Sequence, residues 1–255
     1  MWKRRKRQPK NTRQDGLLDI NGQQVPVRIY REDRRNVRAS IGKEYAYLRM
    51  PHWQSKAEQE KNLQWFRDWL SGRLQQSEGL SDRLSGRQYE DGELLRVGQR
   101  EYRLLLKLED RKTHSAKLQP DGSIVLKLSS AAPERDRSKA IQKLLSRVVA
   151  QDYLPAITRR VHELNERYFR QPVNQVRLKY NHSNWGSCSN NSNINLSTRL
   201  LFAPQEVIDY VIIHELAHLL EMNHSPRFWK LVSDAMPDYR EKEIWLKEHG
   251  RELNF

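Results

Sequence analysis

Three histidines within eleven residues place the tightest constraint on what this chain can fold into. His214 and His218 are four residues apart, and His224 follows six residues later. Residues four apart lie on one face of an α-helix, so the first two imidazoles can bind one metal ion. Glu215 lies about 100° round the same helix, where its carboxylate can reach a water on the metal without being a ligand. Three protein ligands and one open position are typical of a catalytic zinc site.

The residues around this motif predict a buried helix over 204–222. The pattern H-E-x-x-H alone would occur by chance in about 2% of chains of this size. Its surroundings are more informative, because apolar side chains lie on nearly every side of the helix. They are Val207, Ile208, Val211, Ile212, Ile213, Leu216, Leu219 and Leu220. Imidazoles and carboxylates in such a helix are costly unless a metal compensates them, which favours metal binding.

The third ligand requires the chain to turn. Continued as helix, His224 would lie about 9 Å beyond His218 along the axis, so we expect the helix to end near residues 222–223. Ser225 and Pro226 then predict the cap and first turn of a new helix. Glu221, seven residues after His214, is the alternative as a ligand or as a group that orients one. We expect His224 to bind the metal and Glu221 to support the site.

The net charge of +14 is concentrated at the start of the chain. Residues 1–14 hold seven of the excess positive charges and no acid. Such a run predicts a solvated, disordered tail over 1–15, with a nucleic-acid contact as the alternative. No apolar stretch follows it, so we expect neither a signal peptide nor a membrane anchor. Cys188 is the only cysteine, which is compatible with a cytoplasmic location.

Hydrophobic patterning indicates an α+β protein, with strands first and helices later. Strands are expected at 17–29 around an Asn-Gly turn, at 45–50, 101–108, 113–118, 123–128, 175–180 and 193–197. Helices are expected at 54–75, 134–168, 204–222 and 239–249, with a connector at 77–92. Residues 17–23 and 94–99 are similar enough to predict two similar hairpins. We therefore expect a β-rich region over 16–130 and a metal-binding catalytic domain over 131–255.

Several short motifs occur in an order that resembles the YgjP-like metallopeptidase family, relatives of the SprT-like proteases. Besides the histidine motif they are Trp185-Gly186-Ser187-Cys188-Ser189, Asn195-Leu196-Ser197, Ala203-Pro204, Asp209-Tyr210-Val211, Asn223-His224-Ser225 and Phe228-Trp229. The resemblance is specific from about 175 to 248 and looser before that. It implies a zincin-like domain of the small gluzincin type with His214, His218 and His224 as ligands. One departure is His182-Ser183-Asn184 before the tryptophan, where relatives often have Lys-Ser-Arg, which puts a basic substrate contact in doubt.

The leading hypothesis is a zinc-dependent peptidase in which Glu215 activates water, with a peptide or protein as substrate. The strand at 193–197 is a candidate for pairing with an extended peptide. Trp185 is either a cleft residue or a packing residue, and we expect Cys188 to be a buried filler rather than a nucleophile. Candidates for the oxyanion stabiliser are Tyr210, Tyr239 and Arg227.

Two other hypotheses remain open. Hydrolysis of nucleotide phosphoanhydrides would use the same metal site, although no phosphate-binding motif supports it. A nucleic-acid-associated binding module would use the basic tail. The sequence leaves the oligomeric state open.

Overall fold

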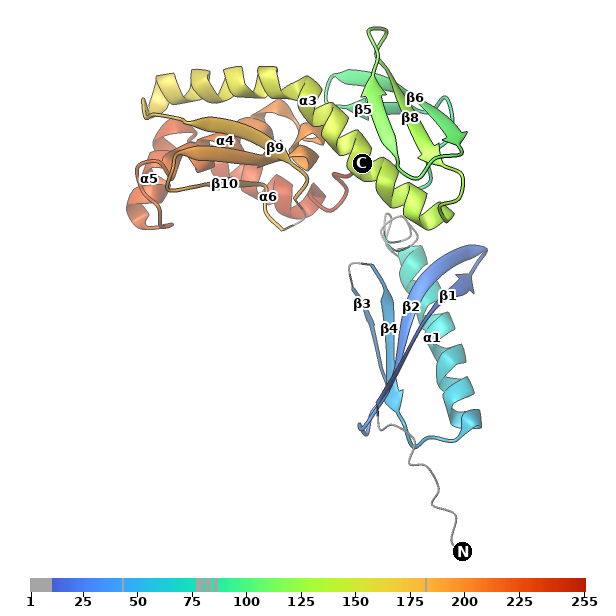
Figure 1. The fold of residues 1–255 in the computed structure, drawn as a ribbon. Coiled ribbons are helices and arrows are strands. Elements are labelled where there is room, and N and C mark those ends of the chain that lie inside the picture. The colour runs from blue at the N-terminus through green and yellow to red at the C-terminus, as the bar shows by residue number, and fades with distance from the viewer. Residues whose placement is uncertain (1–10, 43, 77–79, 81–83, 85–86, 182) are drawn as a thin grey trace, which may run out of the picture. The chain divides into compact units, whose positions relative to one another are not determined.

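The computed structural model describes residues 11–42, 44–76, 80, 84, 87–181 and 183–255. The chain divides into two compact units, Met1–Gln88 and Tyr89–Phe255, and each has its own hydrophobic core (Figure 1). The expected α+β class is confirmed, with strands dominating the first part and helices the second. The division falls at 88/89 rather than at the expected 130/131. The reason is that the strands before residue 130 share one core with the helices after it.

Regular structure begins at Thr12, inside the segment of residues 1–15 that was expected to be a disordered tail. β1 (Thr12–Ile20) pairs antiparallel with the next strand, and Thr12 lies opposite Arg31 and Asp15 opposite Arg28. The backbone of these tail residues therefore has partners in a sheet, which the charge pattern alone did not indicate. Residues 1–10 of the expected tail lie outside the described residues.

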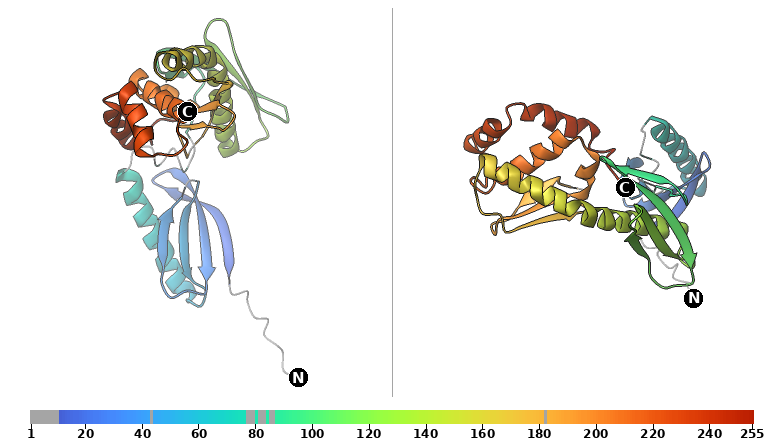
Figure 2. Two further views of the ribbon diagram at one scale, coloured as in Figure 1. Left: turned by 90° about the vertical axis from the view of Figure 1, so that its left-hand side faces the viewer. Right: turned by 90° about the horizontal axis from the view of Figure 1, so that it is seen from above.

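The first unit is a four-stranded sheet with a helix packed on one face. β2 (Gln23–Glu32), β3 (Arg38–Ile41) and β4 (Ala46–Pro51) join β1 in the order β1-β2-β4-β3, and the central pair is parallel. The turn between β1 and β2 has φ of 55° at Asn21 and 84° at Gly22, as a tight two-residue hairpin requires. Phe66 and Leu70 of α1 (Lys56–Gln76) pack on the sheet (Figure 2). Among the described residues of this unit, no other element covers the opposite face.

The second unit begins with a sheet that repeats the first. β5 (Leu94–Val97), β6 (Arg100–Glu109), β7 (Ser115–Leu118) and β8 (Ser123–Ser129) have the order β5-β6-β8-β7. Its central pair is again parallel, its outer pairs are antiparallel, and a long helix follows. The expected similarity of two hairpins therefore extends to two complete sheets.

A third sheet lies beside the long helix α3 (Glu134–Tyr168), which runs through Pro155 as one element. β9 (Gln175–Lys179), β10 (Gly186–Cys188) and β11 (Asn193–Ser197) have the order β10-β11-β9. Strand β11 is antiparallel to β10 and parallel to β9, so both of its sides are occupied. An added peptide strand at residues 193–197, which the sequence suggested, is therefore excluded. The edge strands of this sheet are β10 and β9, and β10 is the one that contacts α4 (Gln205–Ala217).

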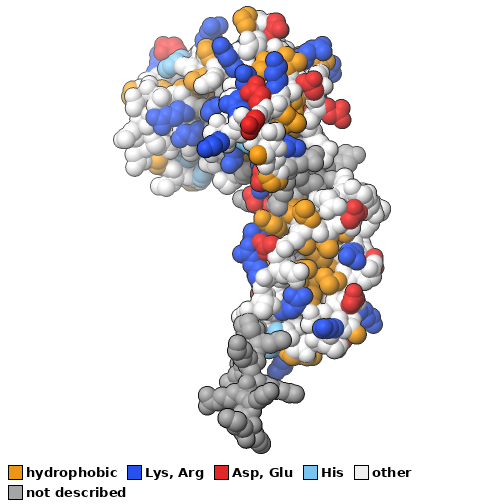
Figure 3. All heavy atoms as spheres, turned by 45° about the vertical axis from the view of Figure 1, so that its right-hand side comes forward, with side chains coloured by type: hydrophobic (Ala, Val, Ile, Leu, Met, Phe, Trp, Pro, Cys, Tyr) orange, Lys and Arg blue, Asp and Glu red, His pale blue; other side chains and the backbone are white. Residues whose placement is uncertain are grey.

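Three helices follow the short 3-10 helix η1 (Thr198–Phe202): α4 (Gln205–Ala217), α5 (Pro226–Ala235) and α6 (Tyr239–His249). The first of these ends at Ala217 rather than at the predicted residue 222. The chain turns there, because the backbone N–H groups of Leu219, Leu220 and Glu221 bond to the carbonyls of Leu216 and Ala217. In the described part of the chain, none of the helices has both the length and the apolar character needed to cross a bilayer. Lys and Arg side chains are spread over both units, most densely over the second in the view of Figure 3.

Candidate metal centre

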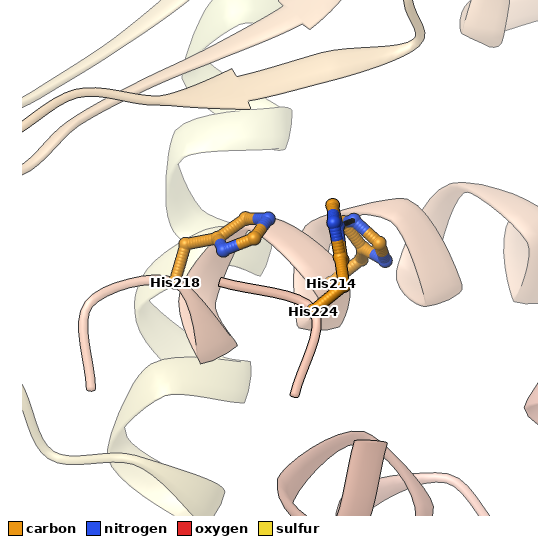
Figure 4. A group of neighbouring side chains, drawn as sticks. All are labelled: His214, His218 and His224. Atoms are coloured by element: carbon orange, nitrogen blue, oxygen red, sulfur yellow. Dashed lines mark hydrogen bonds between the residues drawn. The ribbon is translucent and has the colours of Figure 1, made fainter. Parts of the chain in front are cut away.

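The three predicted histidines meet at one point of the second unit. His214 lies in the last turn of α4, His218 caps its C-terminus, and His224 lies in the loop before α5 (Figure 4). One ring nitrogen from each lies within 4.8 Å of the others. The Nε2 atoms of His214 and His224 are 3.1 Å apart. Two nitrogens that bind one tetrahedral zinc at 2.0–2.1 Å are about 3.4 Å apart, so the observed spacing fits such an ion.

The turn that brings His224 back has a local cause. The Ser225 side chain accepts a hydrogen bond from the backbone N–H of Phe228 at 3.3 Å, and Pro226 starts α5, as the sequence predicted. The helix start is therefore fixed at the residue after His224. Phe228 has none of its surface exposed, and its ring centre lies 4.5–4.9 Å from those of all three imidazoles. Phe228 therefore packs against all three imidazoles, a contact that the sequence did not predict.

Burial favours the neutral form of His214 and His218, which is the form of imidazole that binds metals. Burial, together with the smaller effect of the neighbouring His218 and His224 rings, lowers the pKa of His214 to about 4. Burial also lowers the pKa of His218, although a hydrogen bond to the backbone of Glu221 opposes this. Three imidazoles are a donor set that suits zinc and related transition metals.

Glu221 takes part through its backbone rather than its carboxylate. Its carbonyl oxygen lies 3.1 Å from Nδ1 of His218, which leaves Nε2 of that ring for a metal. Among the described residues, the group that can hold an ion consists of the three histidines without this carboxylate. The early end of α4 explains the difference, because Glu221 no longer lies on the helical face of His214.

Glu215 lies directly beneath the edge strand β10. Its side chain is buried, with 5% exposed, and burial raises its pKa to about 8 against a hydrogen bond from the Cys188 backbone. A Cβ atom on Gly186 would lie 2.5 Å from Oε1 of Glu215 and 2.6 Å from its Cγ. Only a glycine therefore allows the strand to approach this carboxylate so closely. The sequence signalled Glu215 but not this contact, which joins residues far apart in the chain.

A cavity of about 600 Å³ opens over the histidines and Glu215. This volume is within the range of small-molecule and peptide clefts. The other residues that line it are Asn184, Trp185, Gly186, Ser187, Cys188, Tyr210, Val211, Met222, Glu243, Leu246 and Lys247.

Of the three predicted oxyanion candidates, Tyr210 alone lines this cavity. Burial raises the pKa of Tyr210, so its hydroxyl is protonated at neutral pH and able to donate a hydrogen bond. The Tyr239 ring stacks on Tyr210 with centroids 6.4 Å apart, and Arg227 lies exposed at the start of α5. The cavity therefore favours Tyr210.

Trp185 and Cys188 both line the cavity. The guanidinium of Arg199 lies 4.5 Å from the centre of the Trp185 indole ring, and Gly250 lies against the same ring. Trp185 is thus a packed wall residue, which combines the two roles considered for it. Burial, with a smaller effect of Glu215, raises the pKa of Cys188 to about 11, so its thiol stays protonated and is no nucleophile.

A partly buried ion pair fixes α4 against the long helix α3. Arg160 donates from Nε to Oδ1 of Asp209 at 2.9 Å and from Nη2 to Oδ2 at 2.6 Å. Planar two-point pairing of this kind sets orientation as well as contact. The ion pair therefore holds α4, the helix that carries His214 and Glu215, in position against α3.

A family model described as YgjP-like, metallopeptidase domain, matches residues 4–249. Curated proteins give no match. Among solved structures, the crystal structure of the metallopeptidase zymogen abylysin of Pyrococcus abyssi is 23% identical and covers 36% of this chain and 93% of its own, with a TM-score of 0.34. The zymogen of jannalysin from Methanocaldococcus jannaschii is 20% identical, with 36% and 94% covered and a TM-score of 0.32.

Proposed function

Because the chain belongs to the YgjP-like metallopeptidase family, we propose that it is a zinc-dependent peptidase whose catalytic base is Glu215. One observation supports this most directly. Three imidazoles with their ring nitrogens clustered and one buried carboxylate line the same cavity. Each group alone has a structural explanation, but together they match the parts that metal-assisted hydrolysis requires.

His214, His218 and His224 would hold the ion through their ring nitrogens, with Phe228 packed beneath the rings. A bound zinc supplies a Lewis acid that polarises a carbonyl and lowers the pKa of water. The carbonyl of Glu221 orients the His218 ring through Nδ1.

Glu215 would act first as a base and then as an acid. Its carboxylate takes a proton from the attacking water as the new carbon–oxygen bond forms at the scissile carbonyl. It then gives that proton to the leaving nitrogen as the carbon–nitrogen bond breaks. The Tyr210 hydroxyl, which lines the same cavity, would donate a hydrogen bond to the carbonyl oxygen as its negative charge develops.

The substrate would be an extended peptide aligned on β10. This strand has a neighbour on one side only, and its residues line the cavity above Glu215. An extended chain can add to such an edge through main-chain hydrogen bonds. A nucleoside triphosphate fits less well, because Lys247 is the one Lys or Arg among the lining residues and pairs with Glu243 at 2.8 Å.

The test compares metal content and two activities in the full-length protein. We expect about one zinc ion per purified chain, cleavage of a mixed peptide library, and no phosphate release from nucleoside triphosphates. His218→Ala should lose the metal, whereas Glu215→Gln should keep the metal and lose cleavage. Glu221→Gln is the matched control and should retain both.

The outcome that contradicts the proposal is equally definite. Peptide cleavage that survives Glu215→Gln, or phosphate release that Glu215→Gln abolishes while peptides are left intact, would exclude this peptidase mechanism. Zinc that remains at the wild-type level in His218→Ala would exclude the ligand set.

A further inference from the structure

The first unit has an open sheet face that the peptidase site does not use. Along β2 and β4, alternate side chains pack toward α1, and the others point the opposite way. Those on the open side include Arg28, Tyr30, Tyr47 and Arg49, and Tyr45 immediately precedes β4. We call these five residues the tyrosine–arginine face.

Rings and guanidinium groups are in contact along this face. The Arg28 guanidinium lies 3.7 Å from the centre of the Tyr45 ring, and that of Arg49 lies 4.4 Å from the centre of the Tyr30 ring. Tyr30 and Tyr47 are stacked, with ring centroids 6.4 Å apart and planes at 25°. The side chains thus form a row of planar groups across two neighbouring strands.

Positive charge surrounds the row. Arg13 lies opposite Tyr30 in the sheet, and Arg38 lies opposite Arg49. The strands contribute four arginines to this side, Arg13, Arg28, Arg38 and Arg49, against three carboxylates, Asp15, Asp19 and Glu32. Arg13 and Arg28 pair with Asp15, and Arg49 pairs with Glu32, so this side has an excess of one positive charge. Such a surface attracts polyanions.

The second sheet shows that the fold does not require these residues. Its parallel pair can be aligned on that of the first by placing Leu104–Ile124 on Val27–Ala46. The four strand positions of the face are then occupied by Leu105, Lys107, Val125 and Lys127. The same topology therefore forms without aromatic rings at these positions. The fold alone does not account for the tyrosines.

We propose that the tyrosine–arginine face binds single-stranded nucleic acid. Exposed bases stack on aromatic rings and on guanidinium planes, and arginines pair with the phosphates between them. A duplex offers the phosphates but keeps its bases stacked internally, so it matches the cations and leaves the rings unused. The inference uses residues of the first unit alone and is independent of the proposed peptidase activity.

The test is fluorescence anisotropy of the full-length protein with labelled oligothymidylate of about 20 nucleotides, longer than the ~4–16 nucleotides that one small binding domain covers. We expect Tyr30→Leu and Tyr47→Leu each to weaken binding about tenfold, and Tyr30→Phe to retain it because the ring remains. Arg49→Gln should reduce the slope of log affinity against log salt by about 0.7. Circular dichroism on every variant checks that the sheet is intact.

Tyr168→Leu is the matched control, because this tyrosine also has an arginine over its ring, Arg167 at 5.1 Å, but lies in the second unit. It should bind as the wild type does. Competitors are a duplex of the same length, heparin, and vesicles containing phosphatidylserine.

Three results would overturn the inference. The first is no binding of the oligonucleotide. The second is binding that heparin or the vesicles match and that Tyr30→Leu and Tyr47→Leu leave unchanged, which indicates a general polyanion or membrane surface. The third is binding that is lost on deletion of residues 1–10 but is insensitive to both tyrosines.

Discussion

At the scale of single residues, Gly186 is the position on which the placement of Glu215, the proposed catalytic base, most directly depends. The strand and the acid come from different parts of the chain, and their contact leaves no room for a methyl group. A substitution here tests the geometry of the base without touching the metal ligands.

We expect Gly186→Ala to retain the metal and lose about 100-fold in peptide cleavage, because a displacement of the base by about 1 Å has an effect of that order. Gly16→Ala is the control, since its Cβ would have no atom within 4 Å. Metal analysis and steady-state kinetics on both variants provide the comparison. Wild-type turnover in Gly186→Ala would show that Glu215 does not need its observed position.

Tyr210 offers a second residue-scale prediction. Tyr210→Phe removes the hydroxyl and keeps the ring that stacks on Tyr239. If the hydroxyl stabilises the developing charge, kcat should fall about 100-fold with little change in KM. Tyr239→Phe, which alters a residue behind the cavity wall, should leave kcat nearly unchanged. Equal rates for the two variants would remove Tyr210 from the mechanism.

At the scale of elements, the contact most open to test is the ion pair of Arg160 and Asp209, which acts as a clamp between α3 and α4. Asp209 has 11% of its side chain exposed and Arg160 has 37%, so the pair is partly screened by solvent. Asp209→Asn should lower the free energy of unfolding by about 1–2 kcal/mol, below the full value of a buried charged hydrogen bond.

The control for this substitution is Asp234→Asn, which breaks the exposed pair of Asp234 with Lys230 on α5. It should change stability by less than about 0.5 kcal/mol. Urea unfolding of both variants gives the comparison. Equal losses would mean that the clamp contributes no more than a surface pair.

The elements that sequence patterning predicted well are those whose signals are local. The long helix begins and ends where expected at residues 134 and 168, and the Ser225-Pro226 start of α5 is also as predicted. The predicted end of α4 at residue 222 was wrong, because Leu219 and Leu220 continue the apolar pattern although the chain has already turned. The central place of β11 was missed as well, since strand order depends on pairing between distant segments.

The same distinction holds within the site. The spacing of His214, His218 and His224 predicted that they would meet, because it follows from helix geometry and one turn. The packing of Phe228 under the rings and of Gly186 on Glu215 depends on tertiary contacts that no periodicity encodes.

At the scale of the whole molecule, the chain consists of a sheet-and-helix unit followed by a second sheet of the same topology built into the catalytic body. The second sheet contacts the rest of its unit closely at Gly98, which has a φ of +53°. A Cβ there would lie 3.1 Å from the Tyr153 hydroxyl and from the carbonyl oxygen of Leu201. The second sheet is therefore part of the catalytic unit, whereas the first has a separate core.

This organisation predicts how fragments behave. Residues 89–255 should fold alone and bind one metal ion, because their core is complete. Residues 131–255, the catalytic domain expected from sequence, should not fold, because α3 would lose the strands β7 and β8 on which it packs. Thermal unfolding and metal content of the two fragments decide between the boundaries. A cooperative transition in the shorter fragment would favour the one at 130/131.

If a substrate pairs with β10 as proposed, the shortness of this strand would limit how long the substrate stays bound. Three residues of free edge would provide only about two main-chain hydrogen bonds to a guest strand, so residence would be brief and selectivity for any one sequence low. The rate of cleavage would then depend on how often a flexible segment reaches the cleft. A tether that holds enzyme and client on one strand of nucleic acid would raise that frequency through local concentration, with no further contact at the cleft.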